Sequence, residues 1–295
     1  MGKFEFETTG EEVANAFESE IAGKTGSLPT SYALKAHGLG AEAARVIALH
    51  RPALIILAGR SLAKAKQTEH LLSEQSPGIN TRVLSLDLGS LQSVKEAAAE
   101  VNSYSESIDV LINNAGVMAI PRLARTTDGF ELQFGTNHLG HFLLTNLIMP
   151  KIIAAGPGAR IINVSSNGYQ YSSVNFEDPN YQSLAQKLGP LGILSYSLDP
   201  GEKMMPDQKF KTIGQGAATH IAAAFDPSIK SQSYLLLLAA ICRIVAYQIS
   251  DGNGVFLEHS TPSALAEQST WLFDESGPQK LWDMSEKLVG QEFRY

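Results

Sequence analysis

Cysteine is almost absent from this 295-residue sequence, and its scarcity excludes a class of folds. The single cysteine, Cys242, rules out an internal disulfide framework and fits a reducing compartment. Excess positive charge is missing too, because 23 Lys and Arg stand against 30 Asp and Glu, for a net charge of −7. No basic cluster stands out, and this balance argues against nucleic acid as a partner.

Long apolar runs are also missing. The longest, residues 234–247, is too short to span a bilayer and contains Arg243. Residues 1–7 alternate charged and aromatic side chains, which is not the pattern of a secretory signal. We therefore expect a cytoplasmic protein with no transmembrane span. A hydrophobic content of 44% over this length is enough for one α/β domain with a full core.

The most informative stretch is residues 108–116, an apolar run that is broken only by Asp109. The run predicts a strand that is buried on both faces. It ends at Asn113-Asn114-Ala115-Gly116, where small and amide side chains let another molecule approach the backbone closely. In a doubly wound sheet, ligands bind just beyond the carboxyl ends of the strands. The sequence thus predicts a binding site at this point.

Candidate strands and helices alternate around this stretch. Strands are expected at residues 53–60, 81–86 and 158–166, and helices at residues 41–49, 62–74, 90–101, 129–155 (with a break at Pro150) and 213–225. This alternation predicts a doubly wound α/β domain with a mostly parallel central sheet. We expect residues 1–24 to form a leader with an amphipathic helix at residues 11–21, and residues 25–295 to form the single domain.

The region before the first of these helices is irregular. Gly38-Leu39-Gly40 leads directly into the helix, but eleven residues separate Gly38 from Thr25-Gly26. Pro29 cannot donate a hydrogen bond into a central ladder, and residues 31–36 are a poor candidate for a buried strand. Gly38 and Gly40 before a helix could still bring backbone amides close to a phosphate, but the first strand stays unassigned.

On these motifs the sequence resembles the short-chain dehydrogenase/reductase family. Residues 135–142, with residues 213–225 and 279–293, resemble its retinol-dehydrogenase and WW-domain-oxidoreductase branch, in a fungal-type member. The resemblance implies a Rossmann-type fold and an oxidoreductase that interconverts an alcohol and a carbonyl on a small lipophilic substrate. Fungal members often act in secondary metabolism.

The resemblance also implies a nicotinamide cofactor. Arg60 lies twenty residues after Gly40, where a carboxylate would suit NAD and an arginine suits the 2′-phosphate of NADP, so NADPH is expected to be preferred over NADH. A solvated arginine at a strand end is the alternative. Asp87 is expected to accept a hydrogen bond from the adenine amino group. The other implied cofactor-binding residues are Gly38, Leu39, Gly40, Asn114, Ala115, Gly116, Pro200 and Gly201.

For the chemistry, the family uses a tyrosine, a lysine four residues later, a serine that holds the substrate oxygen, and an asparagine that relays protons through water. Ser166 and Asn137 match the serine and the asparagine. No Tyr-x-x-x-Lys occurs, and the nearest pair, Tyr181 and Lys187, is six residues apart. Six residues turn a helix by about 600°, so the two side chains would point roughly 120° apart. The catalytic helix therefore looks truncated.

This departure supports an alternative interpretation, in which the chain is a catalytically impaired member that acts as a nucleotide-binding or interaction module. The shortened helix usually contributes to a dimer interface, so we expect a monomer or a weak homodimer. The apolar insertion at residues 231–252 is read as a buried or substrate-loop helix, as a monotopic membrane contact, or as a segment with no structural role. His138 and His141 lack a third ligand, so no metal site is expected.

Overall fold

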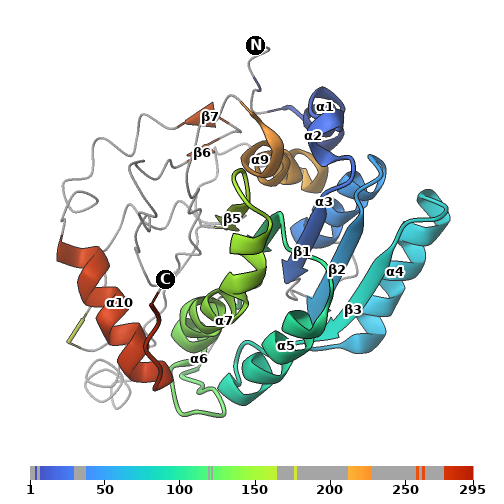
Figure 1. Ribbon diagram of the computed structural model, residues 1–295. Helices are drawn as coiled ribbons and strands as arrows, with labels where there is room; N and C mark the ends of the chain where they lie inside the picture. The colour runs from blue at the N-terminus through green and yellow to red at the C-terminus, as the bar shows by residue number, and fades with distance from the viewer. Residues whose placement is uncertain are drawn as a thin grey trace.

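The computed structural model describes most of the amino-terminal half of the chain and selected parts of the rest (Figure 1). The described residues are 4, 7–29, 38–118, 120, 122–164, 176–177, 212–227, 257–258, 261–262 and 276–294. Several predicted features lie outside these described residues, namely Ser166, Tyr181, Lys187, Pro200, Gly201 and the insertion at residues 231–252.

A five-stranded parallel sheet forms the centre of the fold, in the strand order β3-β2-β1-β4-β5. Its strands are β1 (Thr25–Pro29), β2 (Leu54–Gly59), β3 (Thr81–Ser85), β4 (Val110–Asn113) and β5 (Arg160–Asn163). Because the chain winds outward from β1 in both directions, the topology is that of a doubly wound sheet. The predicted α/β fold class is confirmed. A separate antiparallel pair joins β6 (Leu257–Glu258) and β7 (Thr261–Pro262).

Helices cover both faces of this sheet (Figure 1). The alternating residues of β2 separate two cores, since Ile55 and Leu57 belong to one buried cluster and Leu54 and Ile56 to the other. The first cluster contains side chains of α1 (Gly10–Ala16), α2 (Glu18–Ile21), α3 (Leu39–Ala48), α4 (Leu62–Gln75) and α9 (Ile213–Phe225). The second contains side chains of α5 (Leu91–Ser103), α6 (Leu132–Phe134), the π-helix η1 (Gly135–Leu139), α7 (Gly140–Ala154) and α10 (Ser276–Val289). None of the helices in the described segments is long and apolar enough to cross a membrane.

The structure corrects the expectation that Pro29 keeps this segment out of the central sheet. Residues 25–29 form the central strand β1, which pairs with β2 along its whole length but with β4 only at Gly26 and Ser27. The carbonyl of Thr25 accepts from the Asp109 amide on the β4 side, so the alternating backbone directs residue 29 to that same side. Pairing with β4 has already ended there, and the missing N–H of Pro29 therefore interrupts no ladder.

Asp109 is the polar residue that interrupts the apolar run, and it ties β1 to β4. One carboxylate oxygen accepts from the Thr25 amide at 2.9 Å, and the other accepts from Lys24 Nζ at 3.1 Å. The side chain thus satisfies the first backbone donor of β1 and pairs its charge with a cation. This role explains why a carboxylate stands at the start of a buried strand.

Pro150 does not break the helix that contains it, contrary to the prediction. It lies inside α7, whose buried side is packed against α5. Asn102 of α5 donates to the carbonyl of Leu147 at 2.9 Å, in the turn just before the proline. This bond ties α7 to α5 next to Asn146, the residue whose carbonyl would otherwise accept from the N–H of position 150.

The amino-terminal helices are part of the core. Thr9 and Glu12 form a capping box that begins α1, and Phe17 separates α1 from α2, so the single helix expected at residues 11–21 is divided. Val13, Ala14 and Ile21 are fully buried in the cluster that contains α9. Figure 1 shows α1 and α2 beside α9.

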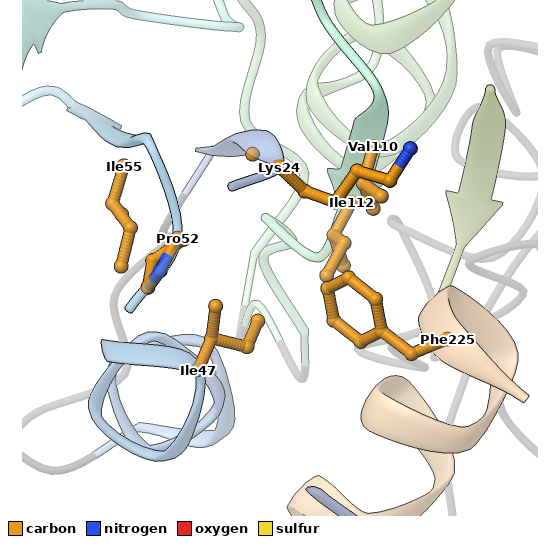
Figure 2. A pocket seen from close by; sticks show the side chains of 8 residues that line it. Lys24, Ile47, Pro52, Ile55, Val110, Ile112 and Phe225 are labelled. Atoms are coloured by element: carbon orange, nitrogen blue, oxygen red, sulfur yellow. The ribbon is translucent and has the colours of Figure 1, made fainter. Parts of the chain in front are cut away.

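A narrow apolar pocket lies on the face of the sheet that α3 and α9 cover (Figure 2). Gly26 sits between Ile55 and Val110 in the strand register, and a Cβ added to Gly26 would meet no atom within 4 Å. The pocket is thus the space that a side chain on β1 would fill. Its lining residues are Lys24, Gly26, Ile47, Pro52, Ile55, Val110, Ile112 and Phe225.

Candidate functional site

The carboxyl end of β4 is held by a buried polar network. Asn113, which is 2% exposed, donates to Thr145 Oγ1 at 3.0 Å and to Asn163 Oδ1 at 2.7 Å. His141 of α7 lies against the same end, with Nε2 at 2.6 Å from the carbonyl oxygen of Ala115 and Nδ1 at 3.2 Å from Asn113 Oδ1. The network joins β4, β5 and α7, so the backbone of the Ala115 turn cannot shift without disturbing all three.

His141 is a neutral group in this network. Burial lowers its pKa to about 4, although the hydrogen bond to the Ala115 carbonyl acts in the opposite direction. Both ring nitrogens face oxygens that only accept, and a neutral ring carries one N–H, so the shorter contact, from Nε2 to the Ala115 carbonyl, is the one that holds the proton. His141 therefore acts as a donor to the backbone of the predicted binding turn.

Asn137 fixes the next part of that turn. Its Oδ1 accepts from the Val117 amide at 2.7 Å, and its Nδ2 donates to the Val117 carbonyl at 2.8 Å. Both polar atoms of the side chain are thus engaged with one peptide segment. Asn137 lies in η1, and π-turns of this kind occur frequently at functional sites.

Asn114 is also engaged within the protein. Its Oδ1 lies 3.0 Å from Nε2 of His220 on α9, across the other face of the sheet. Ala115 is buried at 3%, and its carbonyl is occupied by His141. Of the predicted residues on this turn, Asn114 therefore has a structural contact at its side chain, and Ala115 and Gly116 contribute their backbone to the edge of the sheet.

The predicted phosphate-binding residues begin α3. Gly38 is the N-cap in an extended conformation, and among the described residues no side chain makes a cap hydrogen bond there. Leu39 and Gly40 form the first turn, with Leu39 exposed and Gly40 buried. An N-terminus without a side-chain cap offers backbone N–H groups and the positive end of the helix dipole to an anion. These residues therefore fit a dinucleotide pyrophosphate.

Arg60 and Asp87 follow two neighbouring strands at the same edge. Arg60 comes directly after β2 with an exposed side chain, and it forms no ion pair with any described residue. Asp87 follows β3, and its Oδ1 accepts from the Gly89 amide at 2.9 Å, which shapes the turn into α5. The carboxyl ends of β1, β2, β3 and β4 thus bring Gly38, Arg60, Asp87 and Asn114 to one edge of the sheet.

The sequence did not single out three residues that support the turn after β4: His141, which contacts Ala115, His220, which contacts Asn114, and Ser285, which contacts His138. His141 was considered only as a metal ligand, yet its ring contacts Asn113 and Ala115, and no group of three metal-binding side chains occurs among the described residues. His220 carried no local signal, because its partner Asn114 is 106 residues away. A polar residue on an otherwise apolar helix face was the one available indication for His141 and His220.

Comparison with known proteins identifies the class to which this arrangement belongs. A family model for short chain dehydrogenases matches residues 35–181. Human retinol dehydrogenase 13 is 32% identical over 279 residues, which cover 86% of this chain and 82% of that protein. The short-chain dehydrogenase/reductase prx1 of Penicillium roqueforti is 30% identical, with 85% of this chain and 82% of that protein covered.

The chain belongs to the short-chain dehydrogenase/reductase family of oxidoreductases, which use a nicotinamide cofactor, and it falls in the retinol dehydrogenase-like branch. The predicted resemblance is confirmed. A crystal structure of an uncharacterized protein from Mycobacterium paratuberculosis superposes with a TM-score of 0.56 at 25% identity, over 94% of this chain and 97% of that one.

Proposed function

We propose that this chain is an NADP-dependent oxidoreductase that interconverts an alcohol and a carbonyl group on a small lipophilic substrate. The observation that carries the proposal is the arrangement at the carboxyl edge of the sheet, where α3 begins without a side-chain cap and Arg60 is exposed after the adjacent strand. The helix N-terminus suits a pyrophosphate, and a guanidinium suits a 2′-phosphate. The name of the human relative, a retinol dehydrogenase, supports a lipophilic alcohol as substrate.

In this proposal the cofactor supplies or accepts the hydride, and the chain binds and orients both reactants. Gly38, Leu39 and Gly40 hold the pyrophosphate, while Asp87, Pro200 and Gly201 line the rest of the cofactor site. Ser166 holds the substrate oxygen and Tyr181 exchanges the proton with it; Lys187 assists only if the local helix departs from regular geometry. Asn137 keeps the Val117 segment in place beside them.

The proposal extends to the setting of the protein. We place it in the cytoplasm as a monomer or weak homodimer, with residues 25–295 as one catalytic domain and a role in secondary metabolism. Two of its relatives come from fungi, namely prx1 of Penicillium roqueforti and the oxidoreductase fscI of Fusarium equiseti, which supports the fungal-type assignment.

A second candidate function rests on a different observation, the six-residue spacing of Tyr181 and Lys187. A chain that cannot lower the pKa of its tyrosine would still bind the nucleotide through the edge described above. In that case it is a nucleotide-binding or interaction module rather than a working reductase.

The test is a thermal-shift titration of the purified protein with NADPH and, separately, NADH. A ligand that binds only the folded state stabilises it by about 2.7 kcal/mol at a hundredfold excess over its dissociation constant, which raises Tm by several degrees. We expect this shift with NADPH and a smaller one with NADH. Arg60→Ala should remove the difference. Arg51→Ala, which removes an exposed arginine that precedes β2, should leave that difference unchanged. No shift with either cofactor would refute the proposal.

Turnover separates the two candidates. Lipophilic ketones and aldehydes are screened with NADPH, and turnover is measured as the loss of the nicotinamide absorbance. The screen should show activity that Tyr181→Phe abolishes. A protein that gives the NADPH shift but no turnover supports the nucleotide-binding module instead.

A further inference from the structure

The π-helix η1 contains one residue more than an α-helix would need over the same span. The amide of Gly140 bonds to the carbonyl of Gly135, five residues earlier, instead of four. A single π-turn in an α-helix is rare, and its hydrogen bonding alone does not favour it over the regular helix. Contacts from outside the helix must therefore hold η1.

Two consecutive side chains of η1 make such contacts, and they reach different parts of the chain. Asn137 binds both backbone polar groups of Val117, and His138 Nε2 lies 2.7 Å from Ser285 Oγ on α10. Adjacent residues of an α-helix are rotated by about 100°, so removing the extra residue would turn one of these side chains away from its partner. The two contacts therefore hold the π-turn together.

The direction of the His138 hydrogen bond follows from its partner. Ser285 Oγ is fully buried, and its one proton is donated to the carbonyl of Leu281 at 2.7 Å. Ser285 must then accept from His138, which places a hydrogen on Nε2. Burial of the ring, together with the neighbouring His141, lowers the pKa of His138 to about 3, so this is a neutral ring in one defined tautomer.

Helix α10 is a firm support for this bond. Trp282 and Phe293 pack edge-on against Phe142 of α7, with ring centroids 4.9 Å and 5.8 Å away. Glu286, which is buried, accepts from the Phe293 amide at 2.6 Å and so holds the residues after α10 against the helix. Figure 1 shows α10 on the same side of the molecule as α6 and α7. Ser285 thus keeps a fixed place relative to η1.

We infer that His138 and Ser285 are positioning residues: their hydrogen bond holds the π-turn, and through it keeps Asn137 on Val117 at the edge of the active site. The inference rests on the proposed function only for its effect on turnover. Ser285 lies on α10, 147 residues after His138, so a distant helix thereby controls the geometry of the turn after β4.

The test compares three variants of the full chain by amide hydrogen exchange at Val117 and Gly140. His138→Phe keeps an aromatic ring between Phe134 and Phe142 but cannot donate. His138→Gln keeps a donor. Leu72→Ala, a buried residue of α4 on the opposite face of the sheet, is the matched control for general loss of stability.

His138→Phe should speed exchange at both amides by about tenfold, the effect of losing one buried hydrogen bond. His138→Gln should return exchange to within about threefold of the wild type. Leu72→Ala should lower Tm without this local effect. If exchange in His138→Phe is no faster than in Leu72→Ala, or if His138→Gln exchanges as fast as His138→Phe, the inference is wrong.

A second measurement separates this inference from the proposed function. In a protein that reduces a carbonyl with NADPH, His138→Phe should lower kcat about tenfold and keep the difference between the NADPH and NADH thermal shifts, because Arg60 lies after β2. Equal losses of kcat in His138→Phe and Leu72→Ala would overturn the positioning role. A wild type that never responds to NADPH would refute the proposed function, while the exchange result would still decide the inference.

Discussion

Replacing Gly140 with alanine should force α7 away from the loop that follows β3. A Cβ on Gly140 would lie 2.3 Å from the carbonyl oxygen of Leu88, 2.8 Å from its Cβ and 3.0 Å from its carbonyl carbon. Ordinary van der Waals contact begins near 3.4 Å. None of the three Leu88 atoms can rotate away, because two belong to the backbone and the third is bonded to it. The helix must therefore retreat by about 1 Å.

The magnitude is a balance of two terms. Alanine is favoured over glycine within a helix by about 1 kcal/mol, whereas overpacking in a close-packed core costs about 1–3 kcal/mol and occasionally more. Because the clash at Gly140 involves backbone on one side and a helix on the other, we place its cost at the upper end. The free energy of unfolding should fall by about 2 kcal/mol, which lowers Tm by about 4–8 °C.

Gly26→Ala is the matched control for this substitution. Its Cβ would point into open space, at the pocket on the α3 and α9 face of the sheet. Both substitutions restrict the unfolded chain to a similar extent, so a difference between them reflects the folded state. Gly26→Ala should melt at or above the wild-type temperature in the same thermal scan. If Gly140→Ala melts within about 1 °C of Gly26→Ala, the close approach of Leu88 does not limit this position.

Three further predictions follow from the other contacts. The pKa values of His138 and His141 are lowered to about 3 and about 4 from 6.5, so only the unfolded chain takes up these protons as the pH falls below 6.5. The free energy of unfolding should therefore fall toward pH 4 by about 1 kcal/mol per histidine per pH unit. His138→Gln should reduce that slope in urea titrations. Arg160→Met removes the guanidinium bonds to the carbonyls of Ala223 and Asp226, and should lower the free energy of urea unfolding by about 1–3 kcal/mol. Arg60→Ala should raise the dissociation constant for NADPH at least tenfold and leave that for NADH unchanged, as measured by calorimetry.

Local patterns in the sequence were sufficient for most of the sheet. The apolar runs at β2 and β4 predicted buried strands, and the order of strands and helices predicted a doubly wound arrangement. The motif at Asn113-Asn114-Ala115-Gly116 predicted a binding edge, since ligands in such folds lie beyond the strand ends. The strands and helices were predicted from periodicity and composition, which neighbouring residues carry, whereas the roles of single residues at that edge were implied by the resemblance to the family.

The sequence failed where a backbone's surroundings decide its state. Pro29 argues against a central strand by local rules, yet it ends β1 at a point where pairing with β4 has stopped. Pro150 argues for a helix break, yet packing against α5 and the bond from Asn102 allow α7 to continue. In the first case the absence of a neighbouring strand at that residue, and in the second a contact from another helix, removed the penalty that the local rule assumes.

The sequence by itself determined the class of fold and the family, because buried strands and the motifs at their ends leave short-range patterns. Only the tertiary structure decided which side chains hold that edge. His141 meets Asn113, His220 meets Asn114, and Ser285 meets His138 from distant parts of the chain. A hydrogen bond requires two groups at about 3 Å, and for residues so far apart that distance is set by packing rather than by spacing along the chain.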